Sequence, residues 1–131
     1  MSTLTSTIVQ KKTTLKFSSY LLAEEYLAEK TRIGYLRNLE VNRRFLVPTL
    51  TNIRMLISSS DVLHSWTIPS FGVKVDACPG RLNEVHIVVK RIGMFFGQCS
   101  EICGVNHGFM PTTAVAIDSL MYSYRVTKNF I

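Results

Sequence analysis

The sequence is organised around the stretch Cys99-Ser100-Glu101-Ile102-Cys103-Gly104-Val105-Asn106-His107-Gly108-Phe109-Met110-Pro111. These thirteen residues place two thiols, an imidazole and a thioether in one short segment. Such soft ligands suit copper better than they suit hard cations such as magnesium. A second imidazole, His64, lies upstream at the end of an apolar run. One histidine plus one ligand loop is the set that a two-copper electron-transfer centre requires.

The spacing of the two thiols favours a shared pocket. Cys99 and Cys103 are separated by three residues, so a tight turn directs both sulfurs to the same side. Two facing thiolates can each bridge two copper ions, and each copper then needs terminal ligands. The chain offers His64, His107, the weak thioether of Met110 and the backbone carbonyl of Glu101.

Other uses of the same residues stay open at this point. A structural zinc site can take both thiols and both imidazoles, but it leaves Met110 without a role. A mononuclear blue-copper site leaves one cysteine without a role. A disulfide between Cys99 and Cys103, or a core cysteine pair with incidental histidines, is also compatible with the sequence. The total of three cysteines argues against a disulfide framework.

Length and composition indicate one folded domain. The chain has 131 residues, of which 47% are hydrophobic, and its net charge is +6. No apolar stretch approaches the ~20 residues that cross a bilayer. The basic residues are dispersed and carry no recognition-helix or RNA-binding motif, so we expect no nucleic-acid partner. The first 23 residues lack acids, which fits either a mitochondrial transit segment or a flexible basic tail.

The pattern along the chain predicts an all-β domain at residues 18–118, after a basic tail at 1–17 with room for one strand. One helix is expected over Ser19–Lys30. Apolar residues then alternate or cluster in short runs between Gly and Pro turns, which is typical of a sandwich or barrel. The expected strands lie at Leu36–Val41, Phe45–Val47, around Ile53–Ile57, Val73–Val75, Val85–Val89, Gly93–Phe96 and Thr113–Ile117. Residues 119–131 form a C-terminal extension that is either a subunit contact or a solvated tail.

Two long segments resemble cytochrome c oxidase subunit II. The first runs Asp61-Val62-Leu63-His64-Ser65-Trp66-Thr67-Ile68-Pro69 and continues to Cys78-Pro79-Gly80-Arg81-Leu82-Asn83; the second runs from Phe96 to Pro111. The resemblance implies a cupredoxin-like Greek-key β-barrel or sandwich that carries a binuclear copper centre, CuA. Its implied copper ligands are His64, Cys99, the carbonyl of Glu101, Cys103, His107 and Met110. It further implies that the Glu101 side chain binds magnesium at a site shared with subunit I.

The resemblance also implies a function. The chain would accept electrons from cytochrome c and pass them through CuA toward haem a in subunit I of mitochondrial cytochrome c oxidase, with His107 facing subunit I. The chain itself would be an electron relay within the enzyme. The alternatives are a copper-carrying assembly protein and the CuA domain of a nitrous oxide reductase. The family's acidic cytochrome c contacts have three candidates here, Asp61, Asp76 and Glu84.

Two family features are missing from this sequence. It has no pair of transmembrane helices and no aromatic strand, because Trp66 is its only tryptophan. The sequence therefore looks like the C-terminal half of a split subunit II. A separate N-terminal fragment would supply the membrane hairpin, and a strand of that fragment could complete the fold. The expected location is the intermembrane-space face of an inner-membrane complex.

Two other residues that could be mistaken for ligands have different expected places. His86 is expected on a polar face of the sheet, and Cys78 is expected to be a buried hydrophobic residue.

Overall fold

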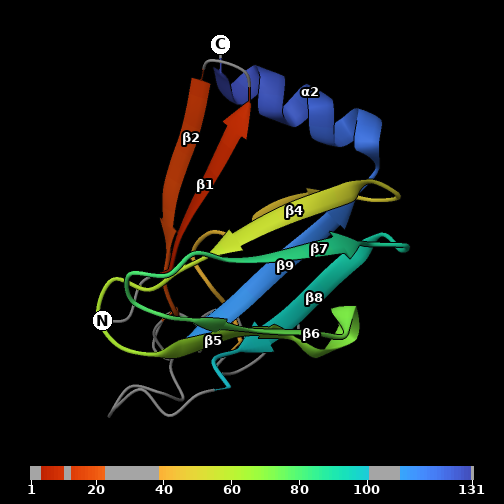
Figure 1. Cartoon of the computed structure of the whole chain (residues 1–131). Helices are drawn as coiled ribbons and strands as arrows, with labels where there is room; N and C mark the ends of the chain where they lie inside the picture. The colour runs from red at the N-terminus through yellow and green to blue at the C-terminus, as the bar shows by residue number, and fades with distance from the viewer. Residues whose placement is uncertain (1–3, 11–12, 23–38, 101–109, 131) are drawn as a thin grey trace.

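The computed structural model describes residues 4–10, 13–22, 39–100 and 110–130 (Figure 1). The described part of the chain begins with a hairpin. Strand β1 (Leu4–Gln10) pairs antiparallel with β2 (Thr13–Ser19), so that Leu4 lies opposite Ser19. The sequence predicted a tail with at most one strand in this region. Two Thr- and Ser-rich runs can nevertheless form strands by satisfying each other's backbone groups.

The central sheet holds three strands in the order β3-β9-β8 among the described residues. Strand β9 (Pro111–Ile117) runs parallel to β3 (Phe45–Pro48) and antiparallel to β8 (Gly93–Gln98). Because β9 lies between two neighbours, it is buried along most of its length. Small residues such as Ala114 and Ala116, both fully buried, allow this close packing.

Two further antiparallel pairs pack near this sheet. Strand β4 (Asn52–Ile57) pairs with β7 (Asn83–Val88), and β5 (His64–Ile68) pairs with β6 (Val73–Ala77). Exposed and half-buried residues alternate along β4, as the period of two in the sequence predicted. A short 3-10 helix, η2 (Pro69–Phe71), joins β5 to β6 and ends at Gly72 with a left-handed φ of 67°.

The hydrophobic core lies where these sheets meet. Its most buried members come from β3, β7 and β9, together with Val89 just after β7: Val47, Ile87, Val89 and Ala116. Aromatic rings extend this cluster, with the ring centroids of Phe45 and Trp66 6.1 Å apart and those of Phe71 and Phe95 4.8 Å apart. Both spacings lie in the range of favourable tilted ring contacts. The predicted all-β class is confirmed, as are the strands at Phe45–Val47, Ile53–Ile57 and Gly93–Phe96.

The chain continues beyond the sheets into helix α2 (Ser119–Phe130), which the sequence analysis did not predict. Asp118 caps its start, because the Leu120 N–H donates to the Asp118 carboxylate at 3.0 Å. Val126 is 4% exposed and packs α2 onto the rest of the domain. Burial also raises the pKa of the Tyr122 hydroxyl above its usual value. The C-terminal extension is therefore a docked helix and not a solvated tail.

Two sequence-based predictions are wrong in the described residues. The helix expected over Ser19–Lys30 does not begin at Ser19, which ends β2, and Leu21 forms a β-bridge with Val41. Residues 23–30 lie outside the described residues. The strand expected at Leu36–Val41 is reduced to that one bridge in residues 39–41. Backbone hydrogen bonds between Leu22 and Glu40, and between Asn42 and Tyr20, explain both differences, because long-range pairing replaces local helical bonding.

Among the described helices, none is long and apolar enough to span a bilayer.

Candidate metal centre

The ends of β8 and β9 hold two of the predicted ligands face to face. Gln98 pairs with Pro111 in the antiparallel ladder, and the next residues continue it, because the Cys99 N–H donates to the Met110 carbonyl at 3.3 Å. Cys99 and Met110, the two ends of the ligand loop, therefore lie next to each other at the end of the sheet. Met110 is only 8% exposed, so its thioether lies inside the fold.

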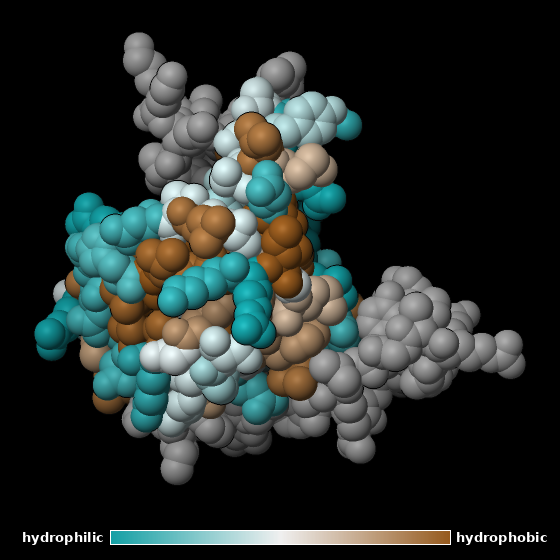
Figure 2. Space-filling model, turned by 90° about the vertical axis from the view of Figure 1, so that its right-hand side faces the viewer, coloured by the Kyte–Doolittle hydropathy of each residue, from teal (hydrophilic) through white to brown (hydrophobic). Residues whose placement is uncertain are grey.

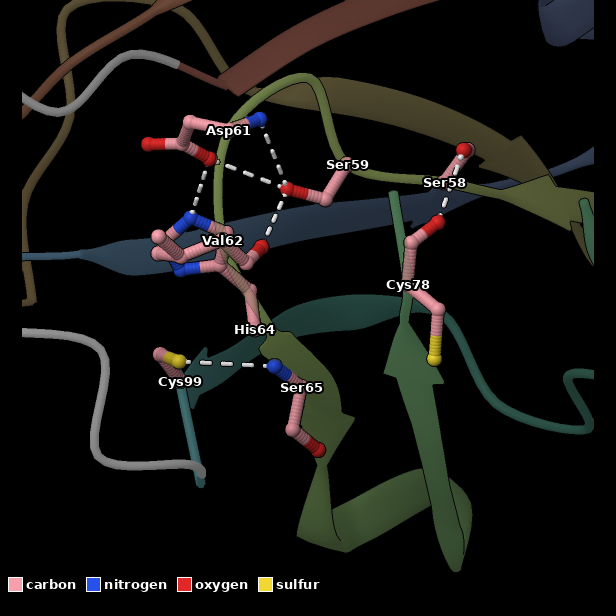
Figure 3. A network of polar contacts seen from close by, with 8 residues as sticks. All are labelled: Ser58, Ser59, Asp61, Val62, His64, Ser65, Cys78 and Cys99. Carbon is pink, nitrogen blue, oxygen red and sulfur yellow. Dashed lines mark hydrogen bonds and ion pairs between the residues drawn. The ribbon is translucent and has the colours of Figure 1, made fainter. Parts of the chain in front are cut away.

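The first residues of β5 bring a third predicted ligand to the same place. The Ser65 N–H donates to the Cys99 sulfur at 3.4 Å, which joins two strands 34 residues apart in the sequence. His64 precedes Ser65 directly, and Figure 3 shows its ring between Asp61 and Cys99. The structure thus brings His64, Cys99 and Met110 to one end of the domain.

The imidazole of His64 is held by a carboxylate. Its Nε2 lies 2.8 Å from Asp61 Oδ1, and the side chain is 17% exposed (Figure 3). The other ring nitrogen, Nδ1, is buried and makes no hydrogen bond within the part of the chain that the structure describes. A buried polar atom without a partner is costly, so such atoms are rare unless something else binds them. This nitrogen is the strongest structural indication of a metal site.

The charge of Asp61 determines which ring nitrogen carries the proton. The Val62 N–H lowers the pKa of the Asp61 carboxyl to about 2, with further hydrogen bonds from His64 and Ser59. An ionised carboxylate only accepts hydrogen bonds, so the proton of neutral His64 lies on Nε2. The lone pair of Nδ1 is then directed into the protein and can bind a metal. A carboxylate on the second nitrogen is the usual support of a metal-binding histidine.

The donor set at this end fits copper. An imidazole nitrogen, a thiol and a thioether are soft or borderline ligands, which suit copper. The other predicted ligands, Glu101, Cys103 and His107, lie outside the described residues, so the structure places three of the six. Within the described ranges no group of three or more His, Cys, Asp or Glu residues gathers. Met110 is not one of those residue types, and the second thiol, Cys103, lies outside the described residues.

Two further residues discussed in the sequence analysis are not among the predicted ligands. His86 is exposed on β7 and its Nε2 lies 2.7 Å from Glu84, so the expectation of a polar-face histidine is confirmed. Cys78 is only half-buried, which corrects the expectation of a buried hydrophobe. Its carbonyl accepts hydrogen bonds from the Ser58 hydroxyl at 3.2 Å and from the Arg81 N–H at 3.3 Å. Cys78 therefore lies at the start of a turn that its backbone carbonyl stabilises.

The sequence analysis missed two residues that position the ligands. Asp61 was considered only as a docking acid, although its spacing of three residues from His64 could have revealed the carboxylate–imidazole pair. The Ser65 N–H carried no sequence signal, because any residue except proline supplies this donor. Its role follows only from the approach of β5 to the end of β8.

Comparison with known proteins supplies the family. Residues 5–117 match the sequence profile described as "Cytochrome C oxidase subunit II, periplasmic domain". The chain belongs to the cytochrome c oxidase subunit II family. Cytochrome c oxidase subunit 2 of Phytophthora megasperma is 59% identical over 103 residues, which are 79% of this chain and 37% of that protein. The protein of the same name from Arabidopsis thaliana is 50% identical over 117 residues, 89% of this chain and 44% of that protein. This subunit II chain therefore spans less than half the length of these relatives.

Solved structures agree with the fold of this subunit II chain. The periplasmic domain of subunit II of cytochrome oxidase (CoxB) from Bradyrhizobium japonicum aligns with a TM-score of 0.74 and 36% identity, covering 86% of this chain and 75% of that one. The same CoxB domain, in a mixed disulfide with the thioredoxin-like protein TlpA, aligns with a TM-score of 0.68 and 34% identity, covering 86% of this chain and 73% of that one. The predicted cupredoxin-like fold is confirmed by these likenesses.

Proposed function

We propose that this chain is the CuA-bearing, electron-transfer part of subunit II in a mitochondrial cytochrome c oxidase. The observation that carries the proposal is the buried Nδ1 of His64, which has no hydrogen-bond partner among the described residues; the Ser65 N–H that follows it bonds to the Cys99 sulfur. The proposed copper ligands are His64, Cys99, the Glu101 carbonyl, Cys103, His107 and Met110. When bound, the copper pair would supply one-electron redox chemistry with little change in geometry.

The residues around the centre contribute rigidity. The Cys99 and Met110 backbones hydrogen-bond across the two strand ends, and Asp61 fixes the ring of His64. Ligands held in this way move little when the charge of the site changes, and small movement favours rapid electron transfer. The described residues of the site would act as metal ligands and as their supports, and the chain would serve the enzyme as an electron relay.

The remaining parts of the proposal concern the whole oxidase. Cytochrome c would donate electrons, and His107 would pass them to haem a in subunit I. The Glu101 carboxylate would bind magnesium at the boundary with subunit I. Relatives from Vigna unguiculata and Glycine max are described as mitochondrial, which supports placing this domain at the intermembrane-space face.

Electron spin resonance of the copper-loaded protein tests the proposal. A copper pair that shares one unpaired electron gives a hyperfine pattern of two equivalent nuclei, and we expect this pattern from the purified oxidase. Cys99→Ser and Cys103→Ser should each abolish it, whereas the matched control Cys78→Ser should leave it unchanged. A single-copper pattern, or zinc at the thiols, would contradict the proposal.

A further inference from the structure

Three strongly exposed aliphatic side chains gather at the end of the domain opposite the metal centre. Leu50 is 77% exposed, Ile92 is 68% exposed and Leu120 is 79% exposed. They come from the turn after β3, the turn after β7 and the first turn of α2. Single exposed aliphatics are ordinary, but exposed apolar side chains that converge from three segments mark an interaction surface. We call Leu50, Ile92 and Leu120 the apical patch.

Backbone contacts bring the three segments together. The Leu50 N–H donates to the Val89 carbonyl at 2.8 Å, and the Thr49 N–H donates to the Ile117 carbonyl at 2.9 Å. Ile92 directly precedes β8, whose first residue pairs with β9 one residue before Ile117. All three segments lie along the same edge in Figure 1. Figure 2 faces this edge and shows brown apolar groups with teal hydrophilic side chains between them.

The backbone conformation of Leu50 is an independent indication that this position has a function. Its φ of 53° lies in the left-handed region, and no other non-glycine residue in the described ranges has a positive φ. This conformation is unfavourable for an L-residue, because it brings the Cβ too close to a backbone carbonyl oxygen. The leucine side chain gains no burial in return within this chain, because it projects outward. Strain of this kind concentrates at functional positions, where a partner makes use of the side chain.

The surroundings of the apical patch are cationic. Lys90 and Arg91 are exposed in the turn that carries Ile92, and Arg125 and Lys128 are exposed on α2. The acid in the same region, Asp118, is engaged with the Leu120 N–H as the helix cap. Residues 119–131 contain no acid at all. A partner that covers the apical patch should therefore present an apolar centre with acidic residues around it.

The apical patch lies far from the metal centre, and its cationic surroundings differ from the acidic contacts expected for the electron donor. Ile92 precedes β8 and Cys99 follows it, so the strand separates the patch from the metal centre by about 20 Å. If the ligand end faces subunit I, as the proposed function requires, the patch faces away from the membrane. We propose that the apical patch docks another protein subunit of the oxidase, one with an apolar centre and an acidic rim. This inference rests on the proposed function for its choice of a protein over a lipid surface.

Site-specific photocrosslinking in the purified holoenzyme tests the proposal. A benzoylphenylalanine in place of Leu120 should crosslink to a different oxidase subunit, at a peptide that contains aspartate or glutamate. The matched control carries the same probe in place of Leu56, which is 49% exposed on the outer face of β4, and should not give that product. Crosslinks to lipid, to a second copy of this chain, or equally from both positions would overturn the proposal.

Surface variants provide a second measurement. Leu50→Asn combined with Ile92→Ser should lower the yield of the crosslink from position 120 at least about tenfold, because apolar anchors dominate such interfaces. Asparagine tolerates the left-handed backbone at position 50, so the domain should fold at least as well. Leu56→Asn with Leu82→Ser is the control pair, because both side chains are exposed near the other end of the β4–β7 pair, and it should leave the yield unchanged. Lys90→Glu with Arg91→Glu should also reduce it, and an unaffected yield in both test pairs would reject the patch.

The copper spectrum of the same samples separates this inference from the proposed function. A two-copper pattern without the expected crosslink rejects the docking surface alone. If the unaltered oxidase does not show the two-copper pattern, the proposed function is rejected. The inferred orientation of the apical patch, which depends on that function, is then rejected too.

Discussion

The backbone N–H of Ser65 donates a hydrogen bond to the sulfur of Cys99 at 3.4 Å. The bond joins the start of β5, which carries His64, to the residue that follows β8. It thereby brings two widely separated segments to the same end of the domain, where we propose the metal site. Hydrogen bonds to a cysteine sulfur draw electron density from it and help to set the reduction potential of bound copper. Four consequences of this arrangement and of its surroundings can be measured.

Ser65→Pro should lower the reduction potential of the copper centre, because it removes the N–H and leaves the thiolate more electron-rich. A hydrogen bond of ~0.5–1.5 kcal/mol corresponds to about 20–60 mV for one electron. Ser65→Ala keeps the N–H and should leave the potential unchanged. Redox titration of the copper absorbance measures both, with circular dichroism to confirm the fold. Equal potentials in the two variants would show that the bond does not act on the metal.

Asp61→Asn should weaken copper binding by about 10–100-fold, the usual effect of losing the support of a metal-binding histidine. The amide can no longer fix the proton of His64 on Nε2 as an ionised carboxylate does. Competition with a copper chelator measures the affinity. Asp118→Asn is the matched control, since Asp118 is an exposed carboxylate that follows β9 at the end remote from Met110, and asparagine can still cap α2. A similar loss in both variants would indicate a general charge effect.

Gly97→Ala should destabilise the domain strongly. A Cβ at Gly97 would overlap the backbone carbonyl of Thr67 on β5, and backbone atoms cannot yield as a flexible side chain can. Overpacking of this kind costs about 1–3 kcal/mol or more. Urea unfolding followed by circular dichroism measures the change. Gly80→Ala is the comparison, because Gly80 has a left-handed φ of 71° but open space around it. We expect the larger loss at Gly97, and the reverse order would mean that β5 and β8 can separate easily.

Glu84 should make the free energy of unfolding depend on pH. Arg54 and then His86 lower the pKa of the Glu84 carboxyl below its ordinary 4.5. A lowered folded-state pKa stabilises the protein above the ordinary pKa, and this contribution is lost as pH falls through the folded-state value. Glu84→Gln should therefore be less stable than the parent at about pH 7, and the difference should disappear in acid.

Arg54→Gln tests the cause of that shift. The Arg54 guanidinium lies 2.6 Å from the Glu84 carboxylate and is the main reason for the lowered pKa. In this variant the Glu84 carboxyl should titrate closer to its ordinary value, as nuclear magnetic resonance of the side-chain carbonyl would report. An unchanged titration would assign the shift to His86 instead.

The sequence predicted most of the strands, because each depends on a local pattern. Ile53, Met55 and Ile57 alternate with residues of the opposite face, and that period of two is visible without knowledge of the neighbouring strand. The sequence missed β5, since His64–Ile68 combines polar and apolar residues without clear alternation. It also missed helix α2, whose buried side depends on Val126 and whose exposed side mixes apolar residues such as Leu120 with charged residues such as Arg125, so that no clear apolar stripe marks it.

The sequence by itself determined the family and the candidate ligands, since the thiols, imidazoles and thioether stand in two long segments that resemble subunit II. The tertiary structure decided which groups support them. Asp61 holds His64 through a local contact, whereas the Ser65 N–H reaches Cys99 and the Leu50 N–H reaches the Val89 carbonyl only because segments far apart in the sequence lie side by side. The physical reason is that backbone donors look alike in every sequence, so their partners are set by the long-range hydrogen bonds and packing of the folded chain.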